Sequence, residues 1–156
     1  MPTPKGSHLR RGRYSEFGRF YLLTTVTHRR RPLFVDLRHA RTVVKYLRLA
    51  DQEGSCQSLA WVVMPDHLHW LVDLKNVTLG TLMRYFKARS SHELHKVGLR
   101  STPVWQAGYH DRALRKEEDV VMVARYIIAN PLRAGLVDRV GSYPHWDAIW
   151  VKGCST

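Results

Sequence analysis

Apolar and polar residues recur along this chain with the two periods that distinguish strands from helices. Short segments rich in β-branched, aromatic and aliphatic side chains are typical of strands. They occupy residues 19–28, 57–64 and 67–74, with a possible fourth strand over 104–115. Pro65 and Asp66 form a tight turn between the second and third segments, so these two strands are expected to pair as a hairpin.

Three longer segments carry apolar residues at helical spacing, and each has a recognisable start. They are residues 36–54, 78–98 and 116–130. Asp36 caps the first helix and Thr78 opens the second. Acidic residues fill the first turn of the third helix, where the helix dipole favours them. That helix should end near Asn130, because a proline disfavours helix in the residue before it. Residues 131–137 then read as a turn leading to a short tail.

The order of these elements predicts the fold. Strand, helix, two strands, helix, strand and a final helix is the ferredoxin-like pattern, an α+β fold with an antiparallel sheet. Two helices should pack on one face, which leaves the other face for a ligand and for the last helix. We find no repeat or linker that would divide the chain, so we expect one domain over 1–156.

The net charge says more about possible function than the hydrophobic content does. Lys and Arg number 25 against 13 acidic residues, a net charge of +12, whereas the 44% hydrophobic content is ordinary. Such a field favours polyanions, nucleic acid first and an anionic membrane surface second. No apolar run approaches the ~20 residues needed to span a bilayer. Residues 1–13 lack the apolar segment of a signal peptide and are expected to form a flexible basic arm. The isolated Cys56 and Cys154 indicate free thiols in a reducing compartment.

The segment "MPDHLHW" at 64–70 places two histidines in a predicted strand. Residues i and i+2 of a strand share a face about 7 Å apart, so His67 and His69 should point together. The residues between and beyond them, Leu68 and Trp70, should then pack the core. Two adjacent neutral imidazoles supply two ligands of a metal site, for which Zn²⁺ stays open beside Mg²⁺. The alternative is a half-exposed histidine pair without a ligand.

The third predicted helix offers further polar groups. Tyr126 lies on the side opposite its apolar stripe, and Asn130, four residues later, lies on the same side as Tyr126. If that side faces the free sheet surface, a hydroxyl nucleophile and an amide oxygen would converge on the two imidazoles. The simpler alternatives are a solvated tyrosine at 126 and a helix C-cap at Asn130.

Three stretches together resemble a known family: "WVVMPDHLHWLV", "VWQAGYHDRALRKEED" and "ARYIIANPLRAGLV". They are similar to the REP-associated tyrosine transposases, bacterial relatives of the single-strand insertion-sequence transposases in the HUH endonuclease superfamily. The similarity runs from Tyr14 to Trp146. The HUH pair alone is a short motif, but the pair followed at this distance by the tyrosine and asparagine segment is specific.

The resemblance implies a chemistry. Family members bind single-stranded DNA folded into REP-like hairpins and recognise a tetranucleotide at the hairpin's 5′ foot. By this likeness His67, His69 and Asn130 hold Mg²⁺ or Mn²⁺, and Tyr126 attacks the scissile phosphate. The products are a 5′-phosphotyrosine and a free 3′-OH that can rejoin strands without ATP. The resemblance also implies a bacterial cytoplasmic, nucleoid-associated protein, which we expect to be a monomer, with a homodimer as the alternative.

Several alternatives stay open. Tyr109, flanked by His110 and Asp111, is a rival nucleophile, although its segment resembles a structural or DNA-contacting strand of the family. A non-catalytic nucleic-acid-binding module would leave the histidines incidental, and a structural zinc protein is disfavoured because neither cysteine has a companion ligand. Basic and aromatic residues are candidates for phosphate and base contacts. They are Arg10, Arg11, Arg13, Tyr14, Arg29, Arg30, Arg31, Arg84 and Lys87.

Overall fold

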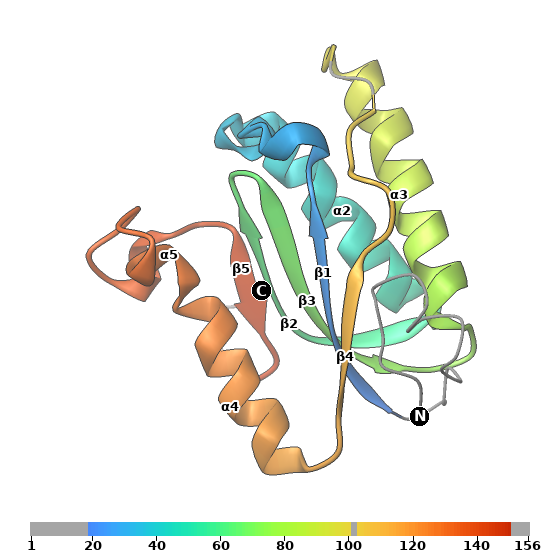
Figure 1. Cartoon of the computed structure of the whole chain (residues 1–156), viewed down its shortest axis with the longest axis vertical. Helices are drawn as coiled ribbons and strands as arrows, with labels where there is room; N and C mark the ends of the chain where they lie inside the picture. The colour runs from blue at the N-terminus through green and yellow to red at the C-terminus, as the bar shows by residue number, and fades with distance from the viewer. Residues whose placement is uncertain (1–18, 101–102, 151–156) are drawn as a thin grey trace.

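The structure of the protein, a computed structural model, describes residues 19–100 and 103–150. Among these residues, five strands form one antiparallel sheet in the order β4-β1-β3-β2-β5. The strands are β1 (Phe20–Val26), β2 (Cys56–Met64), β3 (His67–Leu74), β4 (His110–Leu114) and β5 (Trp146–Ala148). The α-helices are α2 (Leu37–Gln52), α3 (Leu79–Lys96), α4 (Glu117–Ile128) and α5 (Asn130–Arg133). Figure 1 shows the sheet between the α2–α3 pair and α4.

The predicted α+β, ferredoxin-like arrangement is confirmed, because its first four strands pair in the order 4-1-3-2 with α2 and α3 on one face. Local capping explains why the helix starts were predictable. The Asp36 carboxylate accepts a hydrogen bond from the backbone N–H of Arg38, and the Thr78 hydroxyl accepts one from Thr81. The third strand has the predicted bounds, His67–Leu74.

Two hydrophobic cores lie on opposite faces of the sheet. The core under α2 and α3, here called the helix-pair core, contains Leu68, Trp70 and Val72 of β3, all with no exposed surface. The core under α4, here called the α4 core, contains Leu71 of the same strand and Ile127 of the helix. Because side chains alternate along a strand, β3 contributes to both cores.

Three sequence predictions differ from the structure near the C-terminal end. The fourth strand is shorter than the possible 104–115, since the chain turns at Gly108, whose φ of 78° suits glycine. The helix predicted to reach residue 130 ends at Ile128, and Pro131 permits a second short helix instead of a turn. The expected tail contains β5, which pairs with the outer edge of β2.

A basic segment, residues 28–35, follows β1. It contains two 3-10 helices, His28–Arg30 and Leu33–Val35. The amide of Phe34 donates to the Pro65 carbonyl at 3.0 Å, which joins this segment to the turn between β2 and β3. No helix within 19–100 or 103–150 is both long and apolar enough to cross a membrane.

Candidate active site

His67 and His69 lie side by side on the α4-facing surface of β3. The strand register places Val26 and Thr24 of β1 opposite them on one side, and Met64 and Val62 of β2 on the other. The two imidazole rings meet edge to face, with centroids 4.8 Å apart and an angle of 80° between their planes. The predicted shared face is therefore present in the structure, at a place where both rings are only partly buried.

Each histidine has a polar partner at Nδ1. The Asp66 carboxylate lies 2.7 Å from Nδ1 of His67, and the Thr24 hydroxyl lies 2.9 Å from Nδ1 of His69. A carboxylate can only accept, so Nδ1 of His67 donates, and in the neutral form of this ring Nε2 carries the lone pair. Both contacts hold the orientation of a ring, and the Asp66 carboxylate also selects the tautomer of His67, as the outer partners of metal-binding histidines do. The nitrogen available to a metal is then Nε2.

Burial and neighbouring charges shift the pKa values of Asp66 and His69. Burial opposes ionisation of Asp66, but His67 and Arg30 outweigh it, so the pKa of this carboxyl lies below its ordinary value. Burial lowers the pKa of His69 to about 4, with smaller contributions from the charges of His67 and Arg133. His69 is consequently a neutral imidazole at neutral pH and has a lone pair to offer.

Asn130 reaches the histidine pair from the junction between α4 and α5. Its amide Nδ2 lies 3.4 Å from Nε2 of His67, so the side chain contacts the nitrogen that a metal would use. Its Oδ1 accepts a hydrogen bond of 3.3 Å from the guanidinium of Arg133. That guanidinium also covers the ring of Tyr126, 3.7 Å from the ring centroid. A continuous series of contacts thus leads from His67 through Asn130 and Arg133 to Tyr126.

Tyr126 lies off the apolar stripe of its helix, as the sequence indicates. Val120, Val123, Ala124 and Ile127 are the buried side chains of α4, whereas Tyr126 is 63% exposed. The sheet receives the apolar stripe and not the tyrosine face. In the described part of the chain, Asn130 contacts the histidine pair directly, whereas Tyr126 is linked to it only through Arg133 and Asn130. The predicted convergence of the Tyr126 hydroxyl on the two imidazoles is not seen, because the side of α4 that carries the tyrosine does not face the sheet.

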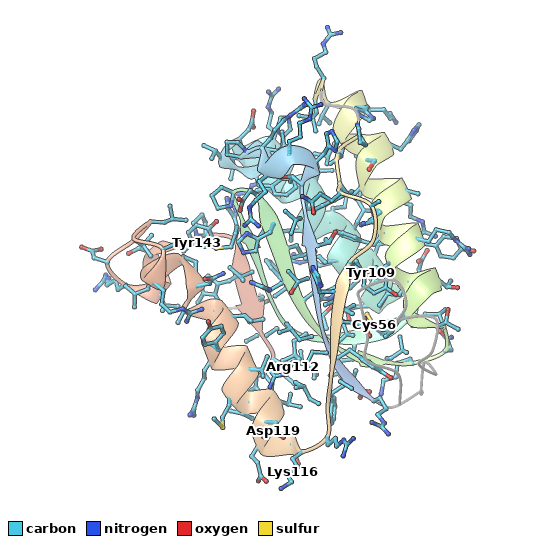
Figure 2. The ribbon with its side chains drawn as sticks, in the orientation of Figure 1. Cys56, Tyr109, Arg112, Lys116, Asp119 and Tyr143 are labelled. Atoms are coloured by element: carbon cyan, nitrogen blue, oxygen red, sulfur yellow. The ribbon has the colours of Figure 1, made fainter. Side chains whose placement is uncertain are left out.

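Tyr109 occupies a different region from the histidine pair. It packs against the helix-pair core, while the next residue, His110, is exposed and stands opposite Thr24 in the sheet. Figure 2 shows Tyr109 on the α3 side of β4 and Arg112 on the α4 side. The packing of Tyr109 agrees with the structural interpretation of this segment.

The predicted DNA contacts differ in their surroundings. Arg10, Arg11, Arg13 and Tyr14, with the whole arm 1–13, lie outside the described residues. Arg29 and Arg84 are exposed, and Arg31 is partly buried. Arg30 pairs with the Asp66 carboxylate at 3.1 Å, so it supports the histidine site indirectly. The Lys87 ammonium donates to the Gln106 carbonyl at 2.7 Å and to that of Gly108, which ties the segment before β4 to α3.

Within 19–100 and 103–150, no three His, Cys, Asp or Glu side chains gather into a metal-binding group. Cys56 is buried in the helix-pair core, where burial and, to a lesser extent, the charge of Asp51 raise the pKa of its thiol to about 12. A metal at His67 and His69 would need Asn130 or substrate oxygens as its further ligands.

Three residues of this site were not identified from the sequence: Thr24, Asp66 and Arg133. Asp66 stands beside His67 in the quoted motif but was interpreted only as a turn residue. Arg133 follows Asn130 by three residues, a spacing that places two helical side chains together. Thr24 carried no local indication, because its contact with His69 depends on the pairing of β1 with β3.

Comparisons with known proteins agree with this fold and motif. The family model described as Transposase IS200 like matches residues 17–130. A REP-associated tyrosine transposase of Escherichia coli (strain K12) is 27% identical over 137 residues, which cover 84% of this chain and 76% of the relative. A solved REP-associated tyrosine transposase bound to a REP hairpin has a TM-score of 0.69 at 25% identity, covering 86% of this chain and 79% of that one. A Deinococcus radiodurans crystal structure shares the fold at 19% identity, with a TM-score of 0.56.

Proposed function

Because this chain belongs to the IS200-like transposase family, we propose that it is a metal-dependent single-strand DNA endonuclease and strand transferase. Its substrate is DNA that carries a palindromic hairpin of the REP type, and its intermediate is a 5′-phosphotyrosine. The observation that carries the proposal is the meeting of His67, His69 and Asn130 at one point, with Arg133 joining Asn130 to Tyr126. We expect the protein to act as a monomer.

The residues present fit a divalent cation. The Nδ1 atoms of both histidines are engaged, and the Asn130 amide lies against Nε2 of His67. A half-turn of this amide about its last side-chain bond exchanges its nitrogen and oxygen and would present the oxygen to a cation. His67 and His69 would hold Mg²⁺ or Mn²⁺ through Nε2, and Asn130 through its amide oxygen. When bound, the metal would neutralise charge on a non-bridging phosphate oxygen and so favour attack on phosphorus.

Tyr126 is the nucleophile of this proposal. Its phenolic oxygen forms a bond to phosphorus, and its proton passes to solvent. The bond between phosphorus and the 3′ oxygen breaks, and that oxygen takes up a proton to become a free 3′-OH. The phosphate stays on the protein as a 5′-phosphotyrosine, and attack by a 3′-OH reverses the step and joins two strands. Bond energy is retained throughout, so no nucleotide cofactor is required.

Arg133 is the positioning residue of the proposal. Its planar guanidinium contacts the face of the Tyr126 ring and donates to Asn130 at the same time. The five N–H groups of arginine also suit the oxygens of a phosphate, which has to enter beside the tyrosine. Arg133 therefore orients the nucleophile relative to the metal ligands and supplies positive charge where the phosphate binds.

Covalent attachment to DNA tests the proposed function directly. Wild-type protein incubated with a labelled hairpin oligonucleotide and Mg²⁺ should give an adduct that survives a denaturing gel. Tyr126→Phe should give no adduct and no cleaved strand, because the attacking oxygen is gone. The free energy of unfolding should change by less than about 0.5 kcal/mol, since the ring is exposed. DNA affinity should persist, because it comes from phosphates and bases.

Tyr109→Phe is the matched control and should retain the adduct. An adduct in Tyr126→Phe that disappears in Tyr109→Phe would assign the nucleophile to the segment before β4. Wild-type protein that binds the hairpin yet forms no adduct with Mg²⁺ or Mn²⁺ would favour the non-catalytic nucleic-acid-binding module.

A further inference from the structure

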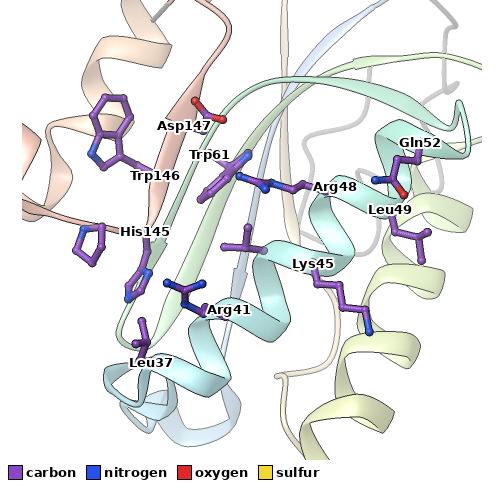
Figure 3. A pocket seen from close by; sticks show the side chains of 12 residues that line it. Leu37, Arg41, Lys45, Arg48, Leu49, Gln52, Trp61, His145, Trp146 and Asp147 are labelled. Carbon is purple, nitrogen blue, oxygen red and sulfur yellow. The ribbon is translucent and has the colours of Figure 1, made fainter. Parts of the chain in front are cut away.

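A groove of about 660 Å³ lies between α2 and residues 144–147, apart from the histidine pair. Its α2 wall carries Arg41, Lys45 and Arg48, and the opposite wall contributes one acidic residue, Asp147. Figure 3 shows Arg41 extending toward His145 and Arg48 toward Trp61. The groove thus has an excess of positive charge that the proposed chemistry at the histidines does not use.

The three cations come from two successive turns of α2, with Arg41 and Arg48 extending into the groove and the Lys45 ammonium lying at its border, 5.4 Å from the centroid of the Tyr46 ring. Their spacing of four and three residues places them on one face of α2, and seven residues of helix extend over about 10 Å. One strand of a DNA duplex rises about 3.4 Å along the duplex axis for each phosphate, so this length of α2 laid along that axis would pass about three successive phosphates. None of the three forms an ion pair with an acid in the described part of the chain, whereas Arg30, Arg38, Lys75 and Arg89 all do.

The aromatic residues of the groove are not arranged to receive unpaired bases. Trp61 forms part of the groove wall but is only 6% exposed. The indole N–H of Trp146 donates to the Val140 carbonyl, and His145 stacks edge to face against Tyr143. Single-strand binding relies on open rings on which bases stack. The groove instead offers charged groups above a closed floor, which suits a phosphate backbone whose bases are paired.

The groove also approaches the candidate active site along the chain. The amide of Val63 donates to the carbonyl of His145 at 2.9 Å. Strand β2 ends one residue later, and the turn that contains Asp66 leads directly into His67 at the start of β3. The Arg41 end of the groove therefore lies beside the strand that leads to the histidine pair. DNA in the groove could continue around this end of the sheet to reach the other face.

We propose that this groove binds the sugar–phosphate backbone of the paired stem of a DNA hairpin, without reading its sequence. The choice of DNA rests on the proposed function, and the site is separate from the one at which the foot of the hairpin would be cut. Arg41, Lys45 and Arg48 each contact a phosphate. The walls hold the duplex by shape and charge, so the stem sequence has little influence on affinity.

The test compares two labelled DNAs in EDTA, where no cleavage occurs. One is a hairpin with an arbitrary stem, and the other is an oligothymidylate with the same number of phosphates. The triple variant Arg41→Gln/Lys45→Gln/Arg48→Gln should bind the hairpin about tenfold more weakly at physiological salt. Its slope of log affinity against log salt should be shallower by about two to three, and binding of the oligothymidylate should change less than about twofold.

The matched control removes three charges elsewhere, in the triple variant Lys96→Gln/Arg115→Gln/Lys116→Gln, and should keep hairpin affinity within about twofold. An equal loss in this control would attribute the effect to net charge and overturn the proposal. An equal loss of hairpin and oligothymidylate in the groove variant would overturn the assignment to the paired stem. Because these measurements need no catalysis, they stand even for a protein that never forms the phosphotyrosine adduct.

Discussion

The two faces of β3 differ in what their side chains contact. On the helix-pair side, Leu68 and Trp70 are completely enclosed by apolar residues, apart from one hydrogen bond from the Trp70 indole to the Ser58 hydroxyl. On the α4 side, His67 and His69 are partly buried, and their ring nitrogens contact a carboxylate, a hydroxyl and an amide. Apolar packing therefore dominates on one face and hydrogen bonding on the other, although the residues that supply the two faces alternate along the strand. The strand can carry a polar surface on one face because its other face is packed in the helix-pair core.

The largest effect on cleavage should come from removing the polar side chains of β3 while its packed side chains stay in place. His67→Ala and His69→Ala should each reduce hairpin cleavage to the uncatalysed background, because each removes a proposed metal ligand. The free energy of unfolding should fall by less than about 1 kcal/mol, as is usual outside a packed core. Cleavage assays with Mg²⁺ and urea denaturation measure the two quantities.

His92→Ala, at an exposed position of α3, is the control and should leave both quantities unchanged. If His69→Ala unfolded the protein as readily as a core substitution, the two faces would not be separable. Full cleavage by the wild-type protein in EDTA would remove the proposed role of the metal.

The converse change removes a packed side chain of β3 and leaves the two histidines in place. Trp70→Ala should lower the free energy of unfolding by about 3 to 5 kcal/mol, because the indole is fully buried and a cavity remains. Trp70→Phe retains a ring and should cost less, so urea denaturation of the pair separates volume from the hydrogen bond to Ser58. At low temperature, Trp70→Ala molecules that remain folded should cut DNA at a rate near that of wild type. Cleavage lost faster than structure would show that the core positions the histidines.

A smaller effect on the rate of adduct formation is expected from Arg133, which links the proposed nucleophile Tyr126 to the proposed metal ligand Asn130. Arg133→Gln should slow adduct formation about 10- to 100-fold at saturating DNA, a loss typical of residues that orient metal ligands. Stability should change by less than about 0.5 kcal/mol, because Arg133 is exposed. Arg133→Lys should recover little of the rate if the planar contact with Tyr126 matters, and most of it if charge alone matters. Single-turnover kinetics give the rate, with Arg125→Gln on α4 as the control.

The features of the fold that could be predicted from the sequence depend on interactions between residues that are close together along the chain. Asp36 and Thr78 mark the starts of α2 and α3, because an N-cap side chain binds a backbone N–H within three residues of itself. Alternation in 67–74 was enough to divide β3 into its two faces. By contrast, β5 is three residues long and exists because β2 offers an edge to pair with, which no local pattern records. The short helix α5 depends on how the chain bends at Pro131.

The candidate site likewise contains residues that the sequence identified and residues that it did not. His67, His69, Tyr126 and Asn130 were selected by spacing and by the family resemblance, and the structure adds the contact between Asn130 and His67. The pairing of Thr24 with His69 spans 45 residues and depends on strand register, so sequence spacing could not reveal it. The basic groove was missed because half of its wall comes from residues 144–147, which the sequence indicated only as a tail.

The contact between His67 and Asn130 has a consequence for when the protein becomes active during synthesis. These residues are 63 positions apart, and the neighbouring contacts of Thr24 with His69 and of Arg133 with Asn130 extend the span of the site further. A ribosome releases the N-terminal residues first, so a growing chain exposes its two histidines long before Asn130 and Tyr126 emerge. Closing so long a loop also requires the sheet and α4 to have docked. Under the proposed function, incomplete or locally unfolded chains would leave DNA intact, and cleavage would begin only when folding is finished.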